Sequence, residues 1–103
     1  MNINHVFGAL ASLPRRQILS FLSQTALSTS DLAARFGTSA PAVSRHLSVL
    51  QHAGLVSAER QGQRVLYRLN RDVLLSALAR FASEVDGPLR RPAPPARVTR
   101  EAI

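Results

Sequence analysis

The stretch SAPAVSRHLSVLQHA, residues 39–53, decides how this chain folds. Its apolar residues Val43, Leu47 and Leu50 recur at the i, i+4 and i+7 spacing of one helical face. A serine at its start is a suitable N-cap, a proline fits the first turn, and a glycine follows its last residue. The stretch therefore predicts an amphipathic helix, with Arg45 on the side opposite the apolar stripe.

A shorter helix is expected immediately before this one. Ser28 and Asp31 have the spacing of a capping box, and Leu32 and Phe36 continue as an apolar face. Gly37 ends this helix shortly before the next one begins. Two short helices joined by a glycine-containing turn form the helix-turn-helix pattern.

The rest of the sequence predicts two helices before this pair, and a hairpin and a helix after it. Residues 4–11 carry apolar side chains at helical spacing, and Ser12 is a suitable cap for a second helix. Residues 55–60 and 64–69 predict two strands around the turn Gln-Gly-Gln, and residues 72–85 predict a last helix. The expected fold is a mainly α (α+β) winged helix-turn-helix of order α-α-α-α-β-β-α, with the hairpin as its wing.

The composition fits one small domain followed by a tail. The chain has 103 residues, of which 46% are hydrophobic, and this is enough for a single core. We expect residues 1–86 to form that domain. Residues 87–103 contain four prolines and four arginines and predict a disordered tail.

The charge is strongly positive. All 13 basic residues are arginines, and with six acidic residues the net charge is +7. This balance favours nucleic acid or an anionic surface as a partner, although an arginine-rich genome composition would give the same count. No apolar run is long enough to span a membrane, no signal-peptide pattern is present and there are no cysteines, so we expect a cytoplasmic protein.

Three stretches resemble the ArsR-type winged-helix repressors. They are LASLPRRQIL (residues 10–19), STSDLAARFGTSAPAVSRHLSVLQHAGLV (residues 28–56) and ERQGQRVLYRL (residues 59–69). The resemblance covers roughly residues 5–85, and residues 39–56 are similar to the family's recognition helix and strand entry almost position by position. One departure is Ser12-Leu13-Pro14 where the family usually has Asp-Pro-Thr; because serine also caps helices, we expect no change of fold.

The resemblance also sets expectations about metal. Many relatives bind metal through cysteines in the helix before the recognition helix, and others through histidine and carboxylate pairs on the last helix. Here residues 29–35 contain no thiol, and residues 71–85 contain Asp72 and Glu84 but no histidine. We therefore expect no metal site of either type and no cofactor.

The expected DNA-binding surface combines the start of the recognition helix with the wing. An α-helix fits the major groove with its N-terminal residues against base edges, and the fork of Arg45 suits guanine O6 and N7. Gly62 at the wing turn lets flanking arginines approach phosphates or a minor groove. The expected DNA-binding residues are Ser39, Ala40, Ala42, Ser44, Arg45, His46, Arg60, Gln61, Gln63, Arg64 and Arg16.

Two of these positions have an alternative interpretation. His46 lies only ~60° around the helix from Val43, so a packed, hydrogen-bonded histidine fits as well as a DNA contact. The resemblance favours a backbone contact for it. Arg15 and Arg16 reach either the DNA backbone or an intramolecular ion-pair partner.

A homodimer is expected because one recognition helix reads only a few base pairs, and symmetric pairing doubles the contact. The resemblance implies that the first and last helices form the interface; alternatively, their apolar side chains cover the monomer's own core. The expected interface residues are Ile3, Val6, Phe7, Leu10, Leu74, Leu78, Phe81 and Val85.

These observations predict a DNA-binding transcriptional repressor that acts on an inverted-repeat operator in double-stranded DNA, at the nucleoid. With no cysteine and no carboxylate pair beside a nucleophile, we expect no enzyme activity. One alternative is a sensor with an unrecognised site for a ligand or metal near His5, Asp72, Glu84 or Asp86. Another is a protein-interaction module with the same fold. The inducer, whether a protein or a small ligand, is not identified by the sequence.

Overall fold

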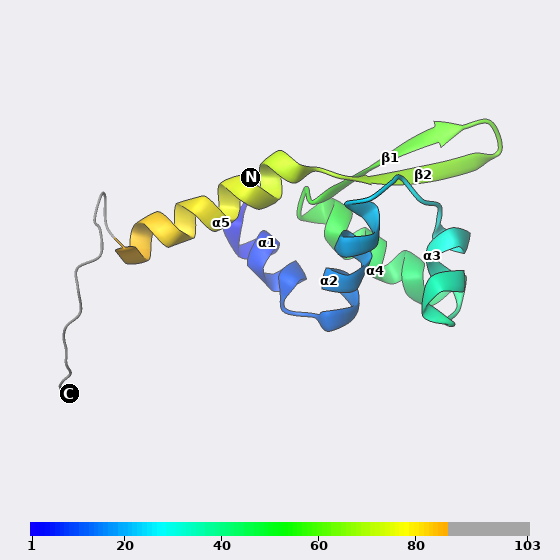
Figure 1. Cartoon of the computed structure of the whole chain (residues 1–103), viewed down its shortest axis with the longest axis horizontal. Coiled ribbons are helices and arrows are strands. Elements are labelled where there is room, and N and C mark those ends of the chain that lie inside the picture. The colour runs from blue at the N-terminus through cyan, green and yellow to red at the C-terminus, as the bar shows by residue number, and fades with distance from the viewer. Residues whose placement is uncertain (87–103) are drawn as a thin grey trace.

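The computed structural model of the protein describes residues 1–86, so the expected tail at 87–103 lies outside the described residues. The element order agrees with the predicted one. In chain order the elements are α1 (Ile3–Leu10), α2 (Leu13–Leu22), α3 (Thr29–Phe36), α4 (Ala40–His52), β1 (Val56–Gln61), β2 (Arg64–Leu69) and α5 (Arg71–Asp86). The fold is a winged helix-turn-helix with α3 and α4 as the helix pair and the β1–β2 hairpin as the wing (Figure 1).

Serine residues start three of the helices, as their sequence positions predict. The hydroxyl groups of Ser12, Ser28 and Ser39 each accept a hydrogen bond from a backbone amide in the first turn of α2, α3 and α4. At α3 the capping box is complete, because the Asp31 carboxylate also accepts the Ser28 amide at 3.0 Å. Asn2 caps α1 in the same way, which the sequence reading did not anticipate.

The end of α4 explains why β1 begins one residue later than predicted. Gly54 has a φ of 81°, and its amide donates to the Gln51 carbonyl at 2.9 Å. The Leu55 amide donates to the Leu50 carbonyl, also at 2.9 Å. This pair of bonds is the Schellman arrangement that closes a helix, so Leu55 belongs to the helix end and not yet to the strand.

The core lies where the helix-turn-helix meets α1, α2 and the base of the wing. Val43, Leu47 and Leu50 are buried on one side of α4, as their spacing predicts. Val6 corrects one prediction, because it is 0% exposed inside the single chain and has no surface left for a dimer interface. The reason is that α1 turns Val6 and Ala9 inward, so its buried face differs from the expected one.

The wing is joined to the body by a short backbone bridge. β1 and β2 pair antiparallel, with Val56 opposite Leu69 at the base and Gln61 opposite Arg64 at the tip. Leu27, in the segment before α3, adds two hydrogen bonds to Tyr67 of β2, at 3.2 and 2.8 Å. The wing therefore lies over the N-terminal end of α3 (Figure 1).

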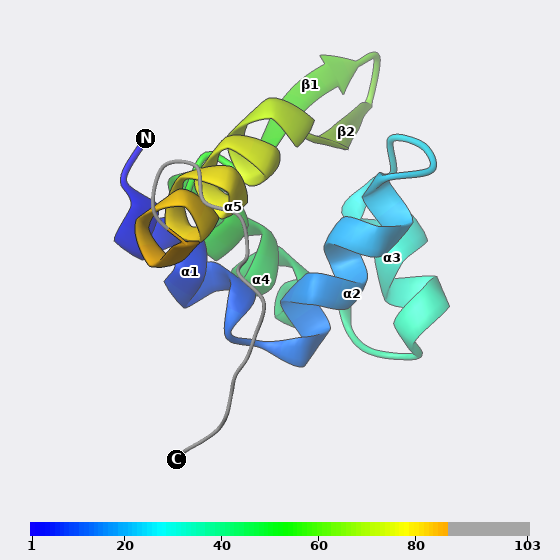
Figure 2. The same cartoon turned by 60° about the vertical axis from the view of Figure 1, so that its left-hand side comes forward.

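Helix α5 crosses α1 and continues past it, as both views show (Figures 1 and 2). Its one buried residue is Ala77, and the ring of Phe81 contacts the edge of Phe7 at a centroid distance of 5.4 Å. A row of apolar side chains stays exposed on this helix: Leu75 at 59%, Leu78 at 44%, Phe81 at 51% and Val85 at 72%. None of the helices within residues 1–86 has the length and apolar character needed to cross a membrane.

Candidate nucleic-acid interface

The N-terminal half of α4 presents a polar face to solvent. Ser39, Ala40, Ser44 and Arg45 are exposed, whereas Val43 between them is buried. The buried stripe fixes the rotation of the helix about its axis, so the exposed face is determined by packing. This end of α4 and the turn of the wing lie on the same side of the molecule, away from the C-terminal part of α5 (Figure 1).

Arg45 is the arginine of α4, and its charge is uncompensated. Within residues 1–86 its guanidinium has neither an ion pair nor a hydrogen bond, so all its donors face solvent. A planar group with five N–H donors fits phosphate or the guanine edge in two-point fashion. The geometry therefore leaves Arg45 available to a nucleic-acid ligand.

The wing tip is narrow and exposed. Gly62 has a φ of 63°, and nothing lies within 4 Å of the position a Cβ would take. Gln61 and Gln63 flank it in the open, and Arg60 donates one hydrogen bond to the Gly62 carbonyl at 3.3 Å. Among the described residues Arg60 has no acidic partner. The glycine is required by its positive φ, and the tip it forms is thin enough to approach a groove.

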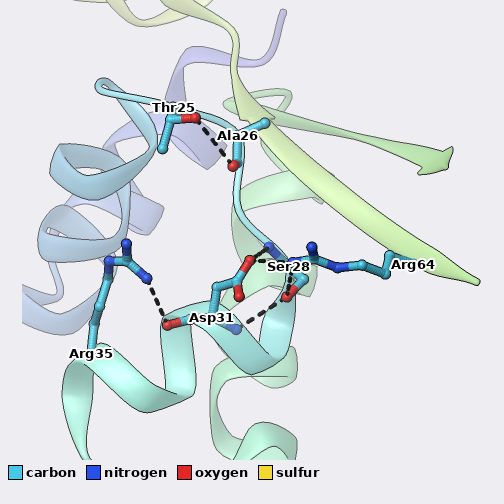
Figure 3. A network of polar contacts seen from close by, with 6 residues as sticks. All are labelled: Thr25, Ala26, Ser28, Asp31, Arg35 and Arg64. Carbon is cyan, nitrogen blue, oxygen red and sulfur yellow. Dashed lines mark hydrogen bonds and ion pairs between the residues drawn. The ribbon is translucent and has the colours of Figure 1, made fainter.

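Arg64 differs from Arg60 although both flank the same turn. Its Nη2 atom forms an ion pair with the Asp31 carboxylate and also donates to the Ser28 hydroxyl at 3.2 Å (Figure 3). Both partners belong to the cap of α3. Arg64 thus links the first residue of β2 to the first turn of the helix-turn-helix.

The cap and the arginine together stabilise the ionised form of Asp31. The backbone amide of Ser28 contributes most, followed by the Ser28 hydroxyl, and the positive charge of Arg64 adds to them. Partial burial acts in the opposite direction but does not prevail, so the pKa of Asp31 lies below its usual 3.8. The carboxylate is therefore a fixed negative charge beside the wing.

The two arginines of α2 bind backbone carbonyls at the end of α1. Arg16 donates to the Leu10 carbonyl at 2.7 Å. Arg15 donates to the carbonyls of Ala9 at 2.9 Å and Gly8 at 3.3 Å. Cations at this position satisfy the last carbonyls of a helix and complement its dipole. The sequence predicted either DNA contact or an ion pair for these two arginines. The structure shows hydrogen bonds to backbone carbonyls instead.

His46 faces inward far enough to contact α2. It is half-buried, and its Nδ1 atom lies 3.5 Å from Nη1 of Arg15. This is the packed arrangement that its helical position allowed. The contact connects the arginine that closes α1 to the middle of α4.

The link between Arg64 and Asp31 is the feature that sequence reasoning missed. The capping box identifies Asp31 and the wing turn identifies Arg64, but the two residues are 33 positions apart. No local pattern pairs residues at that separation. Only the docking of the wing on α3 brings them together.

A pair of histidine rings lies between α1 and α4. His5 and His52 have their ring centroids 4.8 Å apart, on the outer side of the two helices. Asp72, Glu84 and Asp86 lie on α5. No cluster of three metal-binding side chains occurs between residues 1 and 86.

The helix pair, the uncompensated Arg45 and the wing define a winged helix-turn-helix regulator. Residues 14–58 match the family model described as "Bacterial regulatory protein, arsR family". The transcriptional repressor SdpR of Bacillus subtilis is 37% identical over 76 residues, which are 74% of this chain and 84% of that protein. The chain therefore belongs to the arsR family of bacterial transcriptional regulators.

Two further comparisons agree with that placement. The HTH-type transcriptional regulator KmtR of Mycobacterium tuberculosis is 38% identical over 87 residues, but this chain spans only 65% of its length. In three dimensions the chain is similar to the homodimeric winged helix-turn-helix DNA-binding domain of a Mycobacterium bovis protein, determined in solution by NMR. That match has a TM-score of 0.68 at 28% identity and covers 88% of this chain and 85% of the other.

Proposed function

We propose that this protein is a transcriptional repressor that binds an inverted-repeat operator as a homodimer. The observation that carries the proposal is the exposed Arg45 in the N-terminal half of α4. Its positive charge has no acidic partner among the described residues, and the wing on the same side carries Arg60, which has none either. The name of SdpR supports the repressor role, and the M. bovis domain supports the dimer. As a regulator of operator DNA, it acts at the nucleoid.

The proposed contacts with DNA divide by type. Arg45 reads a guanine in the major groove, and Ser44 bonds a base or a phosphate. Ser39, with the amide of Ala40 at the positive end of α4, receives a phosphate. Ala42, whose amide donates to the Ser39 hydroxyl, lies near the base edges at the start of the helix. The remaining proposed contacts are made by the wing residues Arg60, Gln61 and Gln63. Arg16 and His46 are left out of the proposed contacts, because Arg16 donates to the Leu10 carbonyl and His46 packs against Arg15.

The proposed dimer interface joins the exposed side chains of α5 to those of α1. Leu78, Phe81 and Val85 form an apolar row that a lone monomer would leave in water. Phe7 touches Phe81 and extends the row onto α1, where Ile3 and Leu10 are half-buried, as Leu74 is on α5. Burying this face against a second copy removes the exposed apolar area and sets two recognition helices on one side of the DNA.

Selection of binding sites from random DNA with the purified protein tests the proposal. We expect an inverted repeat whose half-sites lie about one helical turn, ~34–36 Å, apart. Arg45→Ala should relax the base preference at one symmetric pair of positions and weaken binding by about 1–3 kcal/mol in each half-site. Arg80→Ala, which removes an exposed i,i+4 ion pair on α5, is the matched control and should change neither.

No enrichment of any inverted repeat would count against the repressor and favour an interaction module with the same fold.

We also propose that the protein lacks the thiolate and α5 metal sites of its relatives. Operator affinity should then be the same with a chelator and with added zinc. A tenfold loss on adding zinc would contradict this part and favour a metal-responsive sensor.

A further inference from the structure

The wing is held at two separate points along β2, one to the segment just before α3 and one to the first turn of α3. The first is the backbone bridge of Tyr67 to Leu27, with hydrogen bonds of 2.8 and 3.2 Å. The second is Arg64, whose guanidinium contacts Asp31 and Ser28. These points are separated by about 10 Å, since a strand rises ~3.3 Å per residue. One point would let the hairpin pivot, whereas two points fix its angle to the helix-turn-helix.

The Asp31 carboxylate, which accepts at the second point, is also held by hydrogen bonds within the cap of α3. The Asp31 carboxylate accepts the Ser28 amide at 3.0 Å, while the Ser28 hydroxyl accepts the Asp31 amide at 3.1 Å. The capping box therefore places two oxygens at the start of α3, and Arg64 binds both through the same nitrogen (Figure 3). A two-stranded hairpin is only marginally stable alone, so such a fixed contact decides its orientation.

We propose that Arg64 is a positioning residue that sets the angle of the wing, and that it is not one of the arginines that bind phosphate. Its charge is balanced by Asp31, whereas Arg60 on the other side of the turn has no acidic partner among the described residues. The inference rests on the proposed function, because Arg64 would affect DNA binding only through the position of Arg60 and the wing tip. It replaces the sequence-based expectation of a direct contact by Arg64.

Phosphate binding and wing positioning by Arg64 predict opposite changes in operator affinity for one substitution. Asp31→Asn removes a negative charge near DNA, while its amide oxygen can still accept the Ser28 amide and keep the cap. If Arg64 bound phosphate, the variant would free it, and the operator would bind as well or more tightly. If Arg64 positions the wing, the operator binds more weakly despite the gain in positive charge. We expect about two- to fivefold weaker binding, the range that a half-exposed ion pair supports.

The salt dependence of operator affinity separates Arg64 from its matched neighbour. Arg60→Gln should lower the slope of log K against log salt by about 1.8, because the homodimer loses one phosphate contact, of about 0.9, in each half-site. Arg64→Gln should weaken binding about two- to fivefold and leave that slope unchanged. The double variant with Asp31→Asn should be no weaker than Arg64→Gln alone, because both remove the same contact. A slope that falls for Arg64→Gln as it does for Arg60→Gln, with tighter binding by Asp31→Asn, would overturn the proposal.

A measurement without DNA keeps this test separate from that of the proposed function. The chain has no cysteine, so Gln61→Cys at the wing tip and Ala34→Cys on α3 give two unique sites for spin labels in each chain. Mixing the labelled chain with an excess of unlabelled protein leaves one labelled chain per dimer. The distance distribution between the labels should broaden with Arg64→Gln and with Asp31→Asn, but not with Arg60→Gln. An unchanged distribution in the Arg64 variant would overturn the proposal even if the operator binds. Failure to bind any DNA would instead reject the proposed function, and the distribution would still report whether Arg64 holds the wing.

Discussion

The arginines of this protein differ in what their guanidinium groups contact, and the contact decides the role of each. Arg45 and Arg60 have no acidic partner among the described residues. Arg15 and Arg16 are held by carbonyls at the end of α1, and Arg64 is held by the α3 cap. The net charge therefore combines arginines that have no acidic partner among the described residues with arginines that are bound within the fold. A count of basic residues overstates the number of phosphates that the protein can neutralise.

Asp31 makes a residue-scale prediction about pH. Because its pKa is lower in the folded chain than the usual 3.8, the folded state favours the ionised carboxylate. Its stabilising contribution is complete above the unfolded pKa and disappears as the pH falls through the lower folded value. Urea unfolding of the wild type and of Asp31→Asn should therefore differ near pH 7, and the difference should vanish in strong acid.

Two variants separate the causes of that shift. Ser28→Ala and Arg64→Gln should each lose only part of the pH-dependent difference, because the Ser28 backbone amide, the largest contributor, remains in both variants. Loss of the whole difference in Arg64→Gln would mean that the ion pair, and not the cap, dominates the acid stability.

At the scale of elements, local signals predicted the helices and strands well. Capping serines, turn glycines and apolar spacing are short-range features, and each element depends on them. Val6 was misplaced because spacing defines an apolar face but does not say whether the chain itself or a second copy covers it. The Arg64 ion pair and the carbonyl contacts of Arg15 depend on how elements dock, which no local pattern contains.

Helix α4 gives an element-scale prediction. Leu50 is 0% exposed, and its neighbour Val49 is 41% exposed on the same helix. Leu50→Ala leaves a cavity in the core and should lower the free energy of unfolding by about 2–5 kcal/mol. Val49→Ala should change it by no more than about 0.5 kcal/mol, as an exposed substitution does. Denaturant unfolding of both variants checks this, and equal losses would show that α4 is packed differently.

At the scale of the whole molecule, the exposed apolar face of α5 is the proposed dimer interface. Phe81→Glu introduces a charge into the proposed interface and should convert the dimer to a monomer at micromolar concentration, with weaker operator binding. Leu13→Glu is the control, since Leu13 is an equally exposed apolar residue, at 57%, but lies on α2. Sedimentation equilibrium measures both. A dimer that survives Phe81→Glu and is lost in Leu13→Glu would place the interface elsewhere.

The bridge between Leu27 and Tyr67 also bears on the order in which the chain folds. It joins segments on either side of α3 and α4, so the loop that the bridge closes contains both helices. Closing such a long loop costs entropy that local helical contacts do not have to offset. We therefore expect the wing to dock after the transition state of folding, so that weakening the bridge accelerates unfolding and leaves the folding rate nearly unchanged. The hairpin that we propose to contact DNA is then expected to be the last part to form and the first to detach.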